Sequence, residues 1–195
     1  SGYQQLTFKD EGVECPGKIA TKMIYAYEPS WSPNGTKIAF NGKLREIVEN
    51  FPHDAVMIMD ANGDNKQVLY SQPFETVHFT DICWTRDGKF LVFQMGLGNE
   101  IQVKVLNVNT LNMIDITNHL IVEGLHPTDI WTSPTENKIA FNKYQPGGGD
   151  LYVIEYTVSD TDQFIISSTY SMLASHDATG KHFGEPHWQS YPVNE

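Results

Sequence analysis

The chain has 195 residues, with 24 acidic residues against 13 lysines and arginines. This negative balance repels phosphate backbones and anionic lipids, so no nucleic acid partner is expected, whereas cations and basic surfaces are favoured. No apolar run approaches the roughly 20 residues that a membrane-spanning helix needs, so no membrane insertion is expected either.

A repeated segment is the first feature along the chain that predicts a fold. Residues 28–40 align without a gap on residues 81–93, and weaker copies span 129–141 and begin again at 185. The spacing of about 50 residues is in the range typical of propeller blades. We therefore expect a single repeat-built domain over residues 1–195 rather than two unrelated small domains.

Each copy predicts two strands joined by a tight turn. The pairs Asn34-Gly35 and Asp87-Gly88 are expected to supply the positive φ angles that short hairpins require. In the third copy Thr135-Glu136 takes this place, so that turn must be longer or of another type.

Two more strands follow each hairpin, and they are rich in β-branched and aromatic residues. The third strands are expected at 55–60, 101–108 and 151–156, and the fourth strands at 67–70, 111–116 and 164–168. Four antiparallel strands per repeat, arranged radially, form a propeller blade. The prediction is an all-β propeller with complete blades at about 24–71, 77–117 and 125–169, and parts of a fourth blade at 1–8 and 182–195.

Two segments fall outside the repeated hairpins. Residues Gln4 to Phe8 look like the outermost strand of a preceding blade. The spacing of Leu44, Ile47, Val48 and Phe51 predicts one short helix within a loop.

The repeat resembles that of TolB-type propellers, which is a run of Pro, any residue, Trp or Phe, Ser, Pro, Asp or Asn, and Gly before a short apolar strand. Residues 28–40 match it nearly residue for residue, and residues 60–63 resemble the turn before the fourth strand. The same repeat serves periplasmic binding proteins, peptidase gating domains and sugar-acid lyases, so it implies a fold and not a function. It also implies a periplasmic or secreted location.

Full rings of this kind have six or more blades, which leaves this chain either a fragment or a protomer with open blade edges. Unpaired strand edges attract other strands, so we expect self-association through these edges.

A carboxylate stands just before the Pro position in all four copies, at Glu28, Asp81, Asp129 and Glu185. Three residues earlier stand Tyr25, His78, His126 and His182. Equivalent positions of successive blades face one channel, so a partial ring of acids below a partial ring of histidines is predicted. It could hold a divalent metal ion such as zinc or manganese, or a cationic side chain of a partner. Alternatively, the acids accept backbone hydrogen bonds from the next blade and the histidines are ordinary loop residues.

Tryptophan recurs at one repeat position, at Trp31, Trp84 and Trp188, which favours packing between blades. Trp131 lies one place out of this register, and the sequence leaves open whether it is a core residue or an exposed platform. Of the two cysteines, Cys83 lies in an apolar strand pattern and is expected to be a buried thiol.

Three functions are compatible with these features. The favoured one is a non-enzymatic binding propeller that offers a loop-rich acidic face and its central channel to a protein or a small ligand. The alternative is a metal-dependent enzyme of the oligogalacturonate-lyase-like propeller type, for which His78, His126 and His182 must converge. A peptidase gating domain would need a catalytic half, and the chain contains no Gly-x-Ser-x-Gly elbow. No catalytic residue is assigned.

Overall fold

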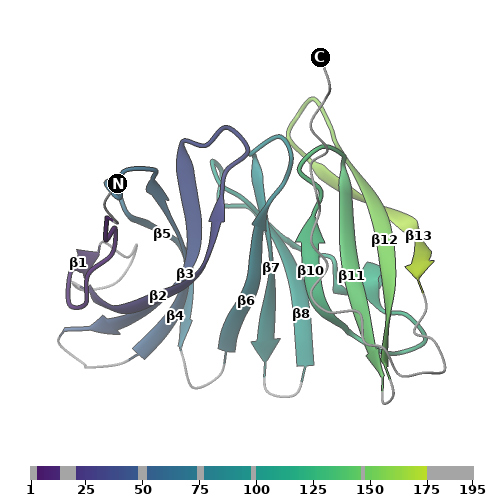
Figure 1. Ribbon diagram of the computed structural model, residues 1–195, viewed down its shortest axis with the longest axis horizontal. Helices are drawn as coiled ribbons and strands as arrows, with labels where there is room; N and C mark the ends of the chain where they lie inside the picture. The colour runs from purple at the N-terminus through teal and green to yellow at the C-terminus, as the bar shows by residue number, and fades with distance from the viewer. Residues whose placement is uncertain are drawn as a thin grey trace.

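The computed structural model describes residues 4–13, 21–47, 52–73, 77–97, 100–145 and 148–174. These residues form three antiparallel sheets that stand side by side in chain order (Figure 1). The first sheet contains β1 (Gly12–Val13), β2 (Thr21–Trp31), β3 (Lys37–Glu46), β4 (Pro52–Asp60) and β5 (Gln67–Pro73). The second contains β6 (Val77–Trp84), β7 (Phe90–Leu97), β8 (Glu100–Asn107) and β9 (Met113–Asp115). The third contains β10 (Pro127–Thr132), β11 (Lys138–Gln145), β12 (Gly148–Val158) and β13 (Phe164–Ala174).

The predicted all-β class and its four-stranded antiparallel units are confirmed. Every expected third and fourth strand is present, although β9 is shorter than expected and β13 is longer. One short helix, α1 (Thr117–Leu120), follows β9. Within the described part of the chain, no helix is long and apolar enough to cross a membrane.

Neighbouring sheets pack through side chains that alternate along the second strand of each unit. Ala39 of β3 shares a buried cluster with Phe93 of β7. In the same way, Val92 of β7 shares a cluster with Phe141 of β11. At both junctions, the earlier unit therefore contributes a smaller side chain and the later unit a phenylalanine. Burial of Val92, Phe93 and Phe141 contributes roughly 1.5–3 kcal/mol each to folding.

The hairpin turns of the first two units share one geometry. Gly35 has φ 69° and Gly88 has φ 68°, and in each turn the glycine N–H donates to the carbonyl oxygen three residues earlier. The preceding Asn34 does not have the positive φ that was expected. Its Oδ1 instead accepts hydrogen bonds from Ser32 Oγ and Thr36 N, which holds the turn closed.

The third turn is of another type, as predicted. None of its residues has a positive φ. Instead, Ser133 Oγ accepts hydrogen bonds from the backbone N–H groups of Thr135 and Glu136. A side-chain acceptor thus replaces the glycine-dependent backbone bond.

The N-terminal segment differs from its prediction. Residues 4–8 form no strand, because an outermost strand needs a neighbour to pair with and the described residues supply none there. Leu6 nevertheless packs on the cluster of the first sheet and lies against Gly63 in the turn between β4 and β5. The segment therefore covers the face of the first sheet that a preceding blade would cover.

The short helix predicted from Leu44, Ile47, Val48 and Phe51 is wrong where it can be checked. Leu44 is a fully buried residue of β3, and Ile47 is half-exposed just after that strand. Leu44 packs with Met23 of β2 in a cluster between strands, so sheet packing overrides a helical spacing of only a few residues. Val48 and Phe51 lie outside the described residues.

Candidate functional site

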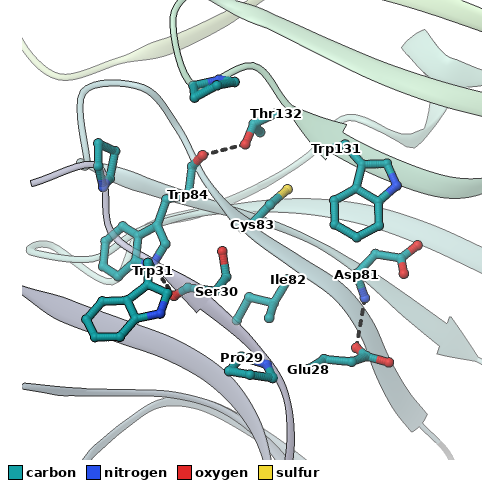
Figure 2. A pocket seen from close by; sticks show the side chains of 12 residues that line it. Glu28, Pro29, Ser30, Trp31, Asp81, Ile82, Cys83, Trp84, Trp131 and Thr132 are labelled. Atoms are coloured by element: carbon teal, nitrogen blue, oxygen red, sulfur yellow. Dashed lines mark hydrogen bonds between the residues drawn. The ribbon is translucent and has the colours of Figure 1, made fainter. Parts of the chain in front are cut away.

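The innermost strands β2, β6 and β10 line a concave groove of about 430 Å³ (Figure 2). Its lining consists of residues 28–31, 33, 81–84, 131, 132 and 134. These strands occupy equivalent places in three consecutive sheets, so the groove lies where the central channel is predicted, and it is called the channel groove below.

Bulges in the innermost strands orient the predicted carboxylates. The pairing of β2 with β3 shifts register between Tyr27 and Ser30, and that of β6 with β7 shifts between Thr80 and Cys83. Within these bulges Glu28 has φ 52° and Asp81 has φ 55°, a left-handed conformation that is uncommon outside glycine, asparagine and aspartate. A bulge bends its strand and re-aims the side chain, so both carboxylates leave the alternation of the strand.

Two of the carboxylates tie one sheet to the next. Glu28 Oε2 accepts hydrogen bonds from Asp81 N at 3.0 Å and from Asn41 Nδ2 at 2.8 Å. Asp81 Oδ2 accepts one from Ile130 N at 3.3 Å. These contacts agree with the alternative in which the acids accept backbone hydrogen bonds from the next blade. Their contact with a ligand stays a prediction.

The third carboxylate bonds within its own sheet. Asp129 Oδ2 accepts from Asn142 Nδ2 at 3.3 Å, which repeats the contact between Glu28 and Asn41. Asn41 and Asn142 both follow the buried phenylalanine of the second strand, so the repeat alignment contained a signal for this pair. Glu185 lies outside the described residues.

The ring of histidines is only partly described. Tyr25 is half-exposed, with Lys43 Nζ 5.8 Å from its ring centroid. His78 is exposed, and its Nδ1 lies 3.3 Å from Asp54 Oδ2. His126 is exposed, and His182 lies outside the described residues.

The described donors do not fit a metal ion. Among the residues that the structure describes, no three His, Cys, Asp or Glu side chains lie close enough together to hold one. No step of chemistry is therefore assigned to a metal here, and the convergence of His78, His126 and His182 stays untested.

Asp54 is a buried carboxylate that the repeat alignment does not reveal. Burial raises its pKa, and this effect is partly opposed by Lys43 and His78. Its Oδ1 lies 3.9 Å from Lys43 Nζ, and the two residues are direct partners in the pairing of β3 with β4. The sequence signal for this residue was therefore the strand register of the β3–β4 hairpin, which places Asp54 opposite Lys43. Burial and the charges of Asp54 and Glu28 also raise the pKa of Tyr27.

The tryptophans do not share one environment, which corrects the expectation that all of them pack between blades. Trp84 is only 6% exposed, and its Nε1 donates to Ser30 O of the preceding sheet at 3.0 Å. Trp31, at the equivalent position, is 58% exposed because no described sheet precedes the first one. Trp131 is partly buried in the groove wall, and Trp188 lies outside the described residues.

The groove combines aromatic rings with carboxylates. Figure 2 shows Trp31 and Trp131 at opposite ends of the view. Aromatic faces attract cations, and nearby carboxylates add to that attraction. Cys83 also lines the groove, but burial raises the pKa of its thiol to about 11, so it is no activated nucleophile.

No protein-family model matches the chain, and no curated protein matches it. Among solved structures, a putative TolB from Agrobacterium tumefaciens superposes with a TM-score of 0.50 and 13% identity, over 76% of this chain and 50% of that one. A prolyl endopeptidase structure gives a TM-score of 0.50 and 12% identity, over 79% of this chain and 22% of that one. The fold is that of a β-propeller.

These similarities concern the propeller fold alone, since the identities are low. TolB from Acinetobacter baumannii is also similar, with a TM-score of 0.43 and 14% identity over 73% of this chain. This propeller chain spans 50% of the length of the putative TolB.

Proposed function

We propose that the chain is a non-enzymatic binding propeller whose channel groove receives a positively charged protein segment or small ligand. The observation that supports this proposal is the groove of about 430 Å³ in which Trp31 and Trp131 accompany Glu28 and Asp81. A large aromatic side chain that is more than half exposed within a concave surface is typical of binding hot spots.

The charges of the chain and of the groove indicate that the ligand is positively charged. The whole chain carries a formal net charge of −11, and the groove-lining residues include two acids and no base. Anionic ligands are therefore repelled at long range and find no counter-ion in the groove, whereas a lysine or arginine side chain finds aromatic faces and carboxylates.

Titration of the chain with hexalysine and with hexaglutamate by calorimetry at 0.15 M salt tests this proposal. We expect hexalysine to bind and hexaglutamate not to bind. Trp31→Ala should weaken hexalysine binding by about tenfold or more, since loss of a hot-spot aromatic costs roughly 2 kcal/mol.

The control is Leu111→Ala, which removes another half-exposed apolar side chain from outside the groove. Both substitutions are neutral, so unspecific attraction between the acidic chain and a basic peptide is the same in both variants. Equal affinities of the two variants, or no binding of hexalysine to the unsubstituted chain, would contradict the proposal.

We further propose that the chain self-associates and that it works in the periplasm or outside the cell. Exposed Met172 and Leu173 on β13, at one end of the sheet array, support association. The location rests only on the resemblance of the repeat. Light scattering over a range of concentrations tests association, which a constant monomer mass would exclude, and cell fractionation tests location.

A further inference from the structure

A second pocket, of about 420 Å³, lies between the second and third sheets and away from the channel groove. One wall comes from the end of β8 and the turn after it, and the other from the turn between β12 and β13. It shares no lining residue with the channel groove. Its volume is in the range of small-ligand sites.

The floor of this pocket is apolar. Phe90 and Val105 are buried, and the ring centroids of Phe90 and Phe164 lie 5.5 Å apart in an edge-to-face arrangement. Ile114 and Ile165 stand half-exposed at the rim. Such a floor accepts a branched apolar group and removes it from water.

The wall formed by the turn between β12 and β13 is tied to the second sheet without a ligand. Lys89 Nζ, from the hairpin between β6 and β7, donates to Asp162 Oδ1 in the turn between β12 and β13 at 2.5 Å. That turn is closed by a hydrogen bond from Asp162 N to Ser159 O at 3.0 Å. A preformed pocket loses less entropy when it binds.

Asn107 is a polar residue of this pocket whose side chain can donate a hydrogen bond to a ligand. The residue is only 4% exposed, and its Oδ1 accepts hydrogen bonds from Asn109 N at 2.9 Å and Thr110 N at 3.0 Å. Its Nδ2 group donates to none of the described residues and is not among the atoms sealed from the surface. A carboxamide has two donors, and this Nδ2 group, which the surface still reaches, is able to donate to an acceptor that a ligand brings into the pocket.

We propose that this pocket binds a neutral peptide segment with a branched apolar side chain. A carbonyl oxygen of the peptide accepts from Asn107 Nδ2, and the side chain lies on Phe90 and Phe164. The rim carries the carboxamides of Asn112 and Gln163, which both donate and accept and so match a peptide group. Asp162 is the charged residue of the lining, and it is already paired with Lys89, so neither a cationic nor an anionic ligand finds a free counter-ion there.

The test uses N-acetyl-leucine-N-methylamide and amide NMR spectra of the full chain. We expect saturable shifts of the Asn107 side-chain NH₂ signals and of backbone amides 161–164, with a dissociation constant on the order of millimolar for so small a ligand. The corresponding glycine compound lacks the branched side chain, and its binding should be weaker by about tenfold or more.

Asn107→Asp separates the ligand contact from the turn. It keeps the Oδ1 acceptor that holds Asn109 N and Thr110 N, and it replaces the donor with a second acceptor. Binding of the leucine compound should fall about tenfold or more, as loss of one hydrogen bond and an added repulsive acceptor require. Asn109→Asp adds the same charge outside the pocket lining and should leave binding unchanged.

Three outcomes overturn the proposal. They are the absence of saturable shifts in the unsubstituted chain, equal binding by the Asn107→Asp and Asn109→Asp variants, and equal binding of the leucine and glycine compounds.

Discussion

Trp31 and Trp84 occupy one position of the repeat but lie in different surroundings. Trp84 is packed between the first two sheets and donates a hydrogen bond across that junction, whereas Trp31 stands exposed at the groove. The same residue type therefore has a structural task in one unit and is available for binding in another.

The same substitution at both positions tests this difference. Trp84→Phe removes the Nε1 bond to Ser30 O and leaves a partly buried acceptor without its donor, so it should lower the free energy of unfolding by about 1 kcal/mol or more. Trp31→Phe should change it by less than about 0.5 kcal/mol, because the side chain is mostly in water. Urea unfolding of both variants measures the two effects, and equal losses would disprove the assignment.

Asp54 and Asp60 should respond to pH with opposite signs. Burial raises the pKa of Asp54 above the ordinary 3.8, so the folded chain binds its proton more strongly than the unfolded chain. The stabilisation that this stronger proton binding gives the folded chain is fully present below the ordinary pKa. It is lost as the pH rises through the pKa of the folded state. Relative to Asp54→Asn, the unsubstituted chain should therefore gain stability when the pH is lowered from 7 towards 4.

Hydrogen bonds from Asn65 and Lys37 lower the pKa of Asp60. Its contribution is present above the ordinary pKa and is lost as the pH falls through the folded value. Relative to Asp60→Asn, the unsubstituted chain should lose stability on acidification. Urea unfolding midpoints at several pH values give the stability difference between the unsubstituted chain and each variant. If both differences changed with pH in the same direction, this assignment would be contradicted.

At the scale of the element, the hairpin turns of the first two sheets each depend on a glycine with a positive φ angle. Gly88 has φ 68°, with only Pro33 Cδ within van der Waals contact of an added Cβ. The strain of a substitution there comes from the backbone rather than from crowding.

Gly88→Ala should therefore cost about 1–2 kcal/mol of unfolding free energy, which is the price of a left-handed alanine. Gly12→Ala is the matched control, since an added Cβ there meets nothing within 4 Å and the residue needs no positive φ. Thermal unfolding compares the two variants. A loss for Gly12→Ala as large as that for Gly88→Ala would show that the turn geometry is not the cause.

At the scale of the whole molecule, the sheets depend on one another because their buried clusters cross sheet boundaries. One cluster joins Ala39 and Val56 of the first sheet to Phe79, Leu91 and Phe93 of the second. A cavity in this cluster affects both sheets, because close-packed interiors relax only partially.

Phe93→Ala should destabilise the chain by about 3–5 kcal/mol. Hydrogen exchange should show faster exchange in β3 and β4 as well as in β7, since Phe93 is fully buried between the two sheets. Phe8→Ala removes a half-exposed ring and should leave exchange unchanged. A loss of protection confined to β7 would mean that the sheets unfold independently.

The sequence by itself determined the local and periodic features of this protein. Four-strand units, glycine turns and equivalent inner strands follow from alternation, turn chemistry and repeat spacing, which act over a few residues and return in each unit. The hairpin without glycine at Thr135-Glu136 was recognisable for the same reason.

Only the tertiary structure decided which equivalent residues differ. Whether Trp31 is exposed or buried depends on the presence of a neighbouring sheet, and no property of the residue itself contains that information. The burial of Asp54 and the open donor of Asn107 likewise arise where side chains distant in sequence meet. Residues 4–8 carry a strand pattern, yet a strand forms only where a partner supplies hydrogen bonds.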